Sequence, residues 1–396
     1  MIAEKMKPLM ANNSAIRTMF EEGDRMRAEF GAENVYDFSL GNPDAPVPDQ
    51  VTEAAVDLLK NEDPVALHGY MSNAGFEDVR QSIADSLNRR FGTKFDYMNI
   101  LMTVGAASGI NVALKTILNP GEEVIIFAPY FLEYNWYVNN YDGKVVQAPT
   151  DKDTFYPDLE AFEKLIGDKT RVVLLNSPNN PTGVIYSEET IKEIASILER
   201  KQKELGRTIF IISDEPYREL AYGGAQVPYI TKYYDNTIVA YSYSKSLSLP
   251  GERIGYLVIP SELEESSLVF DTASNANRII GCVNAPALQQ KIIGRCVDAK
   301  VDLEYYDRNR TALYEGLKAC GFDCVKPEGA FYMFLKSPVE DEGKFCQAAK
   351  KYNILMVPGS AFACPGYVRL AYCVSHETIV NSMEGFKKLA QEFGLA

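Results

Sequence analysis

Residues 172–183 read VVLLNSPNNPTG, a continuous apolar run that ends in a turn rich in asparagine and proline. Valine and leucine side chains in a row, without polar alternation, are typical of a strand whose two faces are both buried. The same kind of run recurs along the middle of the chain, at Val124–Ala128, Ile209–Ser213, Ile238–Ser242 and Gly255–Ile259. These runs predict the buried strands of one central sheet.

Helical patterns separate several of the runs. Ser187–Leu205 begins with a serine suited to N-capping and ends before Gly206. Phe76–Phe91 repeats apolar residues at helical spacing and ends before Gly92. Strands that alternate with helices predict an α/β fold with a mostly parallel sheet.

The two ends of the chain differ from this pattern. Residues 1–45 contain an amphipathic segment, and residues 286–396 begin with a long helical pattern. Two shorter strand-like runs follow in the second region, at Ala330–Leu335 and Val368–Tyr372. We therefore predict a large domain over residues 46–285 and a smaller domain that residues 1–45 and 286–396 build together.

The composition excludes several classes of protein. Of the 396 residues, 46% are hydrophobic and 24% are charged, which is an ordinary globular balance. Forty basic residues against 54 acidic ones give a net charge of −14, so we expect no nucleic-acid partner. No apolar run approaches the roughly 18 residues of a membrane span, and the N-terminus lacks a signal-peptide pattern. We therefore expect a cytoplasmic protein with no membrane partner.

The cysteine and histidine content narrows the chemistry. Seven cysteines without a CxxC pair predict free thiols rather than a disulfide framework. With only two histidines, we expect no histidine-rich metal site and no Ser-His-Asp triad.

Polar side chains follow three successive strands, at the point where each predicted strand ends. Ligands of open α/β sheets bind beyond these carboxyl ends. Each residue has an ordinary alternative, since Asn180 can be a turn residue, Asp214 a helix cap and Lys245 a solvated cation. The prediction of a binding site therefore depends on the whole set at one edge, namely Asn180, Asp214, Tyr217, Lys245 and Arg253.

This set fits pyridoxal 5′-phosphate (PLP). A lysine amine forms a Schiff base with an aldehyde, and a carboxylate that faces a pyridine nitrogen keeps that nitrogen protonated, so the ring accepts electrons from a carbanion. Lys245 and Asp214 are the candidates for these two roles. Asn180 and Tyr217 can donate hydrogen bonds to the phenolic oxygen of the ring, which stabilises that oxygen as an anion.

A phosphate cradle is predicted where a helix begins. Gly105-Ala106-Ala107-Ser108-Gly109 follows the short strand end Met102-Thr103-Val104. Its small residues allow backbone N–H groups at a helix N-terminus to reach a phosphate. Ser242 and Arg253 would add a hydroxyl and a fixed positive charge. The stretch matches neither the Walker A motif nor the GxGxxG dinucleotide motif.

Two further residues allow two interpretations each. Phe131 follows the run Val124–Ala128 and is suited either to stacking on a flat ring or to plain packing. Arg369 stands inside the run Val368–Tyr372 with no acidic neighbour in sequence. It therefore pairs either with a distant carboxylate of the chain or with the carboxylate of a substrate.

Three motifs carry a resemblance to a known family: Asn179-Asn180-Pro181-Thr182-Gly183, Asp214-x-x-Tyr217 and Ser242-x-Ser244-Lys245-x7-Arg253. Nearly the whole chain resembles the class I and II aminotransferases of PLP fold type I, the aspartate aminotransferase superfamily. The resemblance implies a large domain with a mostly parallel seven-stranded sheet flanked by helices, and a smaller α+β domain. It also implies transamination between an L-amino acid, with aspartate or another acidic one as an option, and a 2-oxo acid such as 2-oxoglutarate.

The resemblance assigns roles to individual residues. It implies that Lys245, Asp214 and Tyr217 are catalytic. Lys245 would carry the cofactor and act as the acid/base, Asp214 would pair with the pyridinium, and Arg369 would bind the substrate α-carboxylate. Asn180 and Tyr217 would hold the phenolic oxygen. The phosphate would be bound by Gly105, Ala106, Ala107, Ser242 and Arg253.

Other matching positions concern the substrate and the partner subunit. Gly41 matches the substrate-side loop of the family, and Tyr70 matches a tyrosine that reaches the neighbouring subunit's phosphate, which implies a homodimer with shared active sites. Ala106-Ala107 replaces a hydroxyl or lysine of many relatives, and Phe131 replaces a tryptophan or tyrosine. Arg278 lies close to a second arginine by which aspartate-specific relatives bind the substrate side chain across the dimer.

Other functions stay open from sequence alone. A β-C–S lyase or another α,β-eliminase needs the same electron sink and base on the same fold. A PLP-binding regulator without turnover would share the cofactor, although no DNA-binding extension or basic tail is visible. A nucleotide-binding Rossmann enzyme is disfavoured because the glycine fingerprint is missing.

Overall fold

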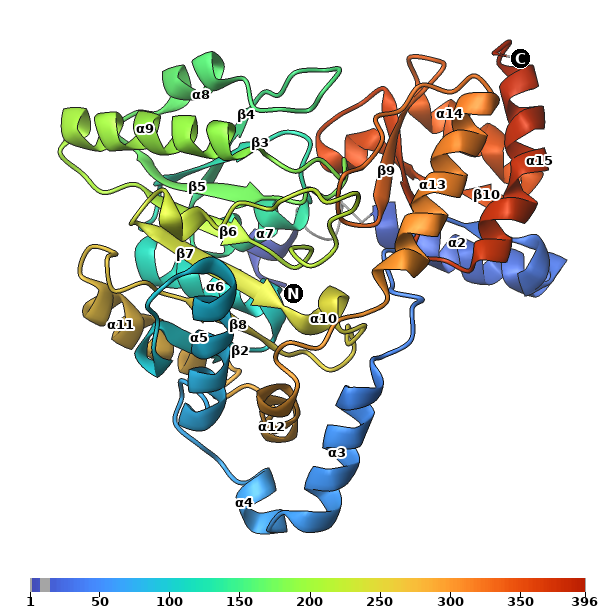
Figure 1. The fold of residues 1–396 in the computed structure, drawn as a ribbon. Coiled ribbons are helices and arrows are strands. Elements are labelled where there is room, and N and C mark those ends of the chain that lie inside the picture. Colours follow the sequence, from blue (N-terminus) through green and yellow to red (C-terminus); the bar gives the residue numbers. More distant parts are fainter. Residues whose placement is uncertain (1, 8–14, 396) are drawn as a thin grey trace.

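A computed structural model describes residues 2–7 and 15–395. Its centre is a seven-stranded sheet with the strand order β2-β8-β7-β6-β5-β3-β4 (Figure 1). Strand β8 runs antiparallel to both of its neighbours, and the remaining pairs are parallel. The mostly parallel α/β sheet is thus confirmed. The strands are β2 (Ile100–Thr103), β3 (Glu123–Phe127), β4 (Lys144–Ala148), β5 (Thr170–Asn176), β6 (Phe210–Asp214), β7 (Thr237–Ser242) and β8 (Gly255–Val258).

The five apolar runs all form strands, with ends that shift by no more than two residues. Asp214 is therefore the last residue of β6 rather than the first residue after it. Strand β4 was not predicted from the sequence. Because β4 is the outermost strand of the sheet, most of its residues are exposed or half-buried. Its two valines are flanked by polar residues.

Both faces of the sheet are buried, which explains the continuous apolar runs. On β5, Val172 and Leu174 belong to the core formed with helices α6, α7 and α11. Val173 and Leu175 point to the other face, where α8 and α9 cover them, while α5 covers β2, β7 and β8. The helices are α5 (Glu77–Phe91), α6 (Gly105–Ile117), α7 (Glu133–Asn140), α8 (Leu159–Leu165), α9 (Glu188–Leu205) and α11 (Ser266–Ile279).

The predicted helix ends are found in the structure. Ser187 caps α9, because its Oγ accepts a hydrogen bond from the backbone N–H of Thr190 at 3.2 Å. Gly206 and Gly92 follow α9 and α5 in the left-handed conformation, with φ of 62° and 72°. These ends fix the register of both helices against the sheet.

A second unit joins residues from the two chain ends. Its antiparallel sheet has the order β11-β12-β9, and β1 pairs with β10 in parallel. Figure 1 shows α2 beside the helices of the C-terminal region. The elements are α2 (Ala15–Phe30), β1 (Tyr36–Asp37), α13 (Leu303–Ala319), β9 (Tyr332–Lys336), α14 (Glu342–Ala349), β10 (Ile354–Leu355), β11 (Val357–Pro358), β12 (Tyr367–Ala371) and α15 (His376–Glu392).

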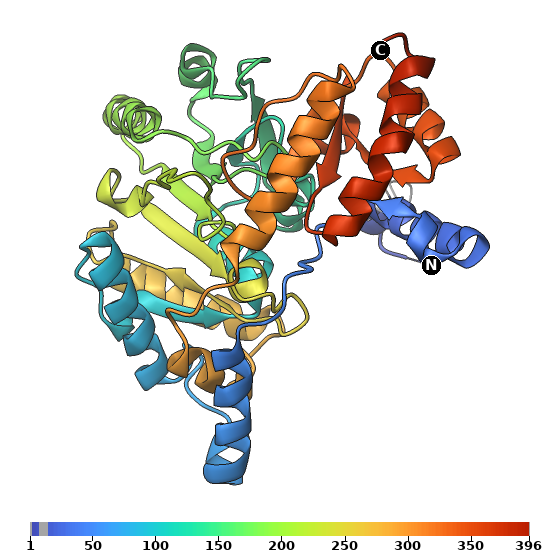
Figure 2. The ribbon, with the colours of Figure 1, turned by 45° about the vertical axis from the view of Figure 1, so that its right-hand side comes forward.

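The long helical pattern after residue 286 is divided into α12 (Ala287–Arg295) and α13, with an irregular segment between them. Helices α3 (Asp49–Asn61) and α4 (Pro64–His68) form an arm at the far end of the large sheet, and α3 packs on α12 (Figure 2). The domain boundaries at residues 46 and 285 stay a prediction. Short 3₁₀ turns lie at Glu4–Met6, Ala32–Asn34, Tyr97–Asn99, Ile230–Lys232, Lys350–Tyr352 and Gly359–Phe362.

Two chain-wide properties bear on function. None of the helices described has the length and apolar content that crossing a membrane requires. All seven cysteines are free thiols.

The carboxyl ends of β5, β6 and β7 lie at one edge of the sheet, facing the second unit (Figure 1). Asn176, the last residue of β5, is in register with Asp214 of β6, and Asp214 is in register with Ala240 of β7. This alignment places the end of β6 between the two neighbouring turns that carry Asn180 and Lys245.

Candidate active site

One pocket of about 330 Å³ lies at this edge, between the large sheet and strands β9 and β12. It gathers nearly all the residues predicted from the strand ends and from the second unit. Those that line it are Gly41, Ala106, Ala107, Phe131, Asn180, Asp214, Tyr217, Ser242, Lys245, Arg253 and Arg369.

Asp214 is a buried carboxylate with two unequal oxygens. Its Oδ2 accepts a hydrogen bond from Tyr134 Oη at 2.5 Å, whereas its Oδ1 is buried without a partner. Burial raises the pKa of Asp214 to about 7, and the nearby charge of Glu215 adds to this rise, although the bond from Tyr134 opposes it. A buried oxygen without a partner requires a hydrogen-bond donor, and none of the described residues provides one.

The side chain of Lys245 is held in place by a hydrogen bond to a backbone carbonyl. Lys245 lies on the short helix α10 (Tyr243–Ser246), and its Nζ donates a hydrogen bond to the carbonyl of Gly41 at 2.7 Å. Burial lowers the pKa of Lys245 to about 8, and the positive charges of Arg369 and Arg253 add to this effect. A sizeable fraction of the amine is therefore neutral, and hence nucleophilic and basic, near neutral pH.

Arg369 is only 2% exposed, and none of the described residues forms an ion pair with it. Its Nη1 donates to Asn180 Oδ1 at 3.2 Å and its Nη2 donates to the carbonyl of Ser39 at 2.6 Å, while its Nε has no partner. A buried guanidinium without a carboxylate partner is costly. Residues 2–7 and 15–395 therefore provide no distant Asp or Glu for it, which favours a substrate carboxylate.

The predicted phosphate cradle begins helix α6. Gly105 has a φ of 78°, and a Cβ there would lie 2.8 Å from Arg253 Nη2, so a side chain at this position would crowd the guanidinium. Arg253 adopts a φ of 55° in spite of its side chain, which is a strained conformation for a residue other than glycine. Ser242 lies at the end of β7, and its Oγ caps α10 by accepting from the N–H of Ser244.

Three predicted residues do not line the pocket. Gly105 directly precedes the lining residue Ala106 at the start of α6. Tyr70 is 93% exposed, and Arg278 is exposed near the end of α11. Tyr70 and Arg278 also do not line this cavity. Their implied roles across a dimer interface stay predictions.

The pocket also contains residues that sequence reasoning missed. Asn176 joins two strand ends, because its Nδ2 donates to the carbonyl of Asp214 and its Oδ1 accepts from the N–H of Asn180. Three tyrosines complete the wall, namely Tyr134, Tyr137 and Tyr332. Tyr134 lies three residues after Phe131 at the start of α7, and this helical spacing was the one signal that could have revealed it.

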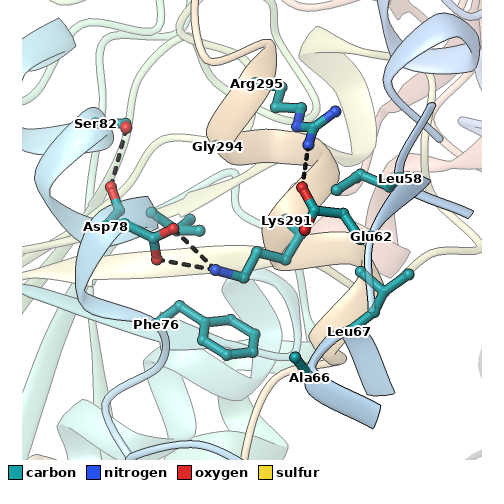
Figure 3. Close-up of a pocket in the computed structure, with 11 residues that line it drawn as sticks. Leu58, Glu62, Ala66, Leu67, Phe76, Asp78, Ser82, Lys291, Gly294 and Arg295 are labelled. Carbon is teal, nitrogen blue, oxygen red and sulfur yellow. Dashed lines mark hydrogen bonds and ion pairs between the residues drawn. The ribbon is translucent and has the colours of Figure 1, made fainter. Parts of the chain in front are cut away.

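A second hollow of about 370 Å³ lies between α4, α5 and α12 (Figure 3). Its two cations are already neutralised, since Lys291 pairs with Asp78 at 2.8 Å and Arg295 pairs with Glu62 at 2.6 Å. It thus offers no free charged group, in contrast to the pocket at the strand ends.

Comparisons with known proteins agree with the chemistry of the strand-end pocket. The family described as aminotransferase class I and II matches residues 33–386. The chain belongs to this family. A probable aspartate/prephenate aminotransferase of Aquifex aeolicus is 32% identical over 372 residues, which cover 91% of this chain and 92% of the relative.

Solved structures show the same relationship. The crystal structure of an amino transferase from Eubacterium rectale is 47% identical, has a TM-score of 0.96 and covers 99% of both chains. The aspartate aminotransferase from Thermus thermophilus with maleate is 26% identical, with a TM-score of 0.87 over 98% of this chain and 99% of that chain. Because the family is PLP-dependent, this aminotransferase is a transaminase that uses PLP.

The residues of the pocket fit PLP. The unpaired Oδ1 of Asp214 is an acceptor for the N–H of a pyridinium, and that positive charge would compensate the buried carboxylate. The α6 N-terminus with Ser242 and Arg253 offers donors and positive charge for the phosphate. Lys245 provides the amine that the aldehyde requires.

The lowered pKa of Lys245 can be measured directly. We expect the reactivity of Lys245 toward trace acetic anhydride, in the PLP-free protein, to rise with a midpoint near pH 8, because only the neutral amine reacts. Quantitative mass spectrometry of the labelled peptides measures this midpoint, with the surface lysines of the same digest as internal reference. A midpoint near that of an ordinary lysine, about 10.4, would contradict the assignment.

The raised pKa of Asp214 predicts a dependence of stability on pH. In the PLP-free protein, Asp214 holds a proton up to about pH 7, whereas the unfolded chain releases it near the ordinary value of 3.8. The free energy of unfolding, relative to Asp214→Asn, should therefore fall as pH rises through this window, by roughly 4 kcal/mol in total. Urea unfolding from about pH 5 to about pH 8 covers the upper part of this window and should show roughly 3 kcal/mol of the fall. Parallel curves for the two proteins would refute the prediction.

Proposed function

We propose that this aminotransferase exchanges an amino group between an L-amino acid and a 2-oxo acid in the strand-end pocket, with Lys245 as its acid/base. The observation that carries this proposal is the pairing of two perturbed groups in one cavity, the buried carboxylate of Asp214 and the amine of Lys245. Groups whose environments move their pKa values toward neutrality are typical of proton-transfer sites.

Each residue then has a defined task. PLP, when bound, supplies an electron sink for negative charge at the substrate Cα. Lys245 removes the Cα proton as a neutral amine and holds it as an ammonium ion. The carbonyl of Gly41 can stabilise that ammonium, since it accepts a hydrogen bond from Nζ at 2.7 Å. Near neutral pH, a cation at its free Oδ1 would keep Asp214 fully ionised, so Asp214 would act together with the bound cofactor.

Arg369 orients the substrate. Its guanidinium has an unpartnered Nε and no carboxylate from the described residues, so it can bind the α-carboxylate of an amino acid. Asn180 fixes the guanidinium through its Oδ1 and, with Tyr217, would bind the phenolic oxygen. Asn180 therefore takes part both in orienting the substrate and in binding the cofactor.

The substrate side chain is proposed to be acidic, with 2-oxoglutarate as the amino acceptor. Relatives named for aspartate support this, and so does the Thermus thermophilus structure with maleate. The three cations that line the pocket are Lys245, Arg253 and Arg369, and each already has a task. We therefore propose that a cation for a second carboxylate comes from another subunit, for which the exposed Arg278 is available.

A homodimer with shared active sites is part of the proposal. Tyr70 is 93% exposed, and apolar side chains at and beyond the end of α11 are also exposed, with Ile279 at 60% and Val283 at 40%. Large exposed apolar groups of this kind mark interaction surfaces. The seven free thiols support a cytoplasmic location, because thiols stay reduced there.

The half-reaction tests the transaminase assignment. The PLP-loaded protein should convert an amino acid stoichiometrically into its 2-oxo acid, with loss of the visible absorption band. Lys245→Ala should lower this rate by roughly 10²–10⁴-fold, because the proton has no acceptor. Lys60→Ala is the matched control, since Lys60 is exposed on the distant helix α3.

Two outcomes would contradict this prediction. Full activity of Lys245→Ala would remove the lysine from the mechanism. Release of ammonia and pyruvate without an oxo-acid acceptor would instead indicate an eliminase. A screen of the common amino acids in the same assay identifies the substrate.

The dimer is tested by mass. Sedimentation equilibrium should give about 88 kDa, which is twice the chain mass of 44.2 kDa. A species of 44.2 kDa that retains full activity would refute the shared active site.

A further inference from the structure

Tyr332 lines the pocket and contacts two of the residues to which the proposed function gives a task. It is the first residue of β9, lies opposite Ala371 of β12, and is only 3% exposed. Its hydroxyl lies 3.1 Å from the hydroxyl of Tyr217, and its ring lies against the guanidinium of Arg369. It thus contacts both the proposed cofactor ligand and the proposed substrate ligand.

The ring of Tyr332 helps to hold Arg369 in place. The guanidinium carbon lies 4.4 Å from the centre of the Tyr332 ring and 4.7 Å from that of Phe362. Two aromatic rings at such distances stabilise a cation that has no carboxylate partner in the described structure. The Nε edge of the guanidinium is left without a partner.

The hydroxyl of Tyr332 also explains the glycine at position 41. A Cβ at Gly41 would lie 2.0 Å from Tyr332 Oη and 2.8 Å from Tyr332 Cζ. A side chain at position 41 would therefore displace Tyr332. The carbonyl of the same glycine accepts the hydrogen bond from Lys245 Nζ, so the backbone that holds Lys245 lies directly against Tyr332.

We propose that Tyr332 is a positioning residue that acts on the cofactor through Tyr217 and on the substrate through Arg369. This inference rests on the proposed function, in which Tyr217 binds the phenolic oxygen and Arg369 binds the α-carboxylate. Each hydroxyl has one proton to donate. The proton of Tyr217 is free for the phenolic oxygen only if Tyr332 donates to Tyr217, and a donor that itself accepts a hydrogen bond is strengthened.

Two substitutions separate the two tasks. Tyr332→Phe removes the hydroxyl and keeps the ring, whereas Tyr332→Leu removes both. The matched control is Tyr222→Phe. Tyr222 is buried in the same core and its hydroxyl donates to the carbonyl of Ala330, but it does not line the pocket.

The first readout is spectroscopic. In the PLP-loaded enzyme, the pH midpoint of the visible absorbance change should rise by roughly 0.4–1 unit in Tyr332→Phe, because Tyr217 becomes a weaker donor to the phenolic oxygen. Tyr222→Phe should leave the midpoint unchanged. An unchanged midpoint in Tyr332→Phe, or an equal shift in Tyr222→Phe, would overturn the role of the hydroxyl.

The second readout is kinetic. Tyr332→Leu should raise the KM for the amino acid by roughly 3–30-fold, because the guanidinium loses its stacking partner, whereas Tyr332→Phe should keep KM within about twofold. Equal KM values in the two variants would overturn the role of the ring. If Tyr332→Leu does not fold, Tyr332→Met replaces it as a longer apolar side chain without a π face; a raised KM there supports the role of the ring, and an unchanged KM overturns it.

The wild-type enzyme separates this inference from the proposed function. A wild-type protein that binds PLP and performs the half-reaction, but whose Tyr332 variants behave like Tyr222→Phe, refutes the role of Tyr332 alone. A wild-type protein that shows neither the absorption band nor the half-reaction refutes the proposed function, and the inference with it.

Discussion

A carboxylate buried at the end of β6, with one oxygen bonded and the other free, is the constraint on which the site depends. Burial disfavours the charge of Asp214, and the structure adds only one hydrogen bond, from Tyr134, to offset that cost. The adjacent Glu215 is itself fully compensated, since it accepts bonds from Ser213 and from Arg218. Of these two carboxylates, only Asp214 keeps an oxygen without a partner, its Oδ1, and Asp214 lines a cavity suited to a protonated heterocycle.

The rest of the pocket carries positive charge, although the net charge of the chain is negative. The protein has a net charge of −14, yet three cations line one cavity, which would attract an anionic cofactor and anionic substrates. The three cations are stabilised by groups other than carboxylates. Lys245 and Arg253 donate to backbone carbonyls, and Arg369 lies between aromatic rings. No described carboxylate pairs with any of them, so their charge stays available for ligands.

The large sheet and the polar groups at its strand ends could be predicted because both follow from local sequence. Strands buried on two faces need continuous apolar runs. Residues in the turns that follow such runs lie at the carboxyl ends of the strands, as Asn180 and Lys245 do. Strand β4 could not be predicted, since an edge strand has no such requirement. The break between α12 and α13 was also missed, because helical periodicity continues on both sides of it.

Tyr134 and Tyr332 show a different limit. The chain has 24 tyrosines, and a tyrosine is equally suited to a core and to a hydrogen-bonded pocket wall, so its type alone indicates neither. What distinguishes Tyr332 is a contact with Gly41, almost 300 residues away in sequence, where a Cβ would meet the hydroxyl. Gly41 was matched to a substrate loop without a physical reason for its lack of a side chain. The structure supplies that reason, and in doing so it links the backbone that holds Lys245 to the ring that holds Arg369. A glycine at position 41 and a tyrosine at position 332 are therefore one packing constraint, because neither can become larger without displacing the other.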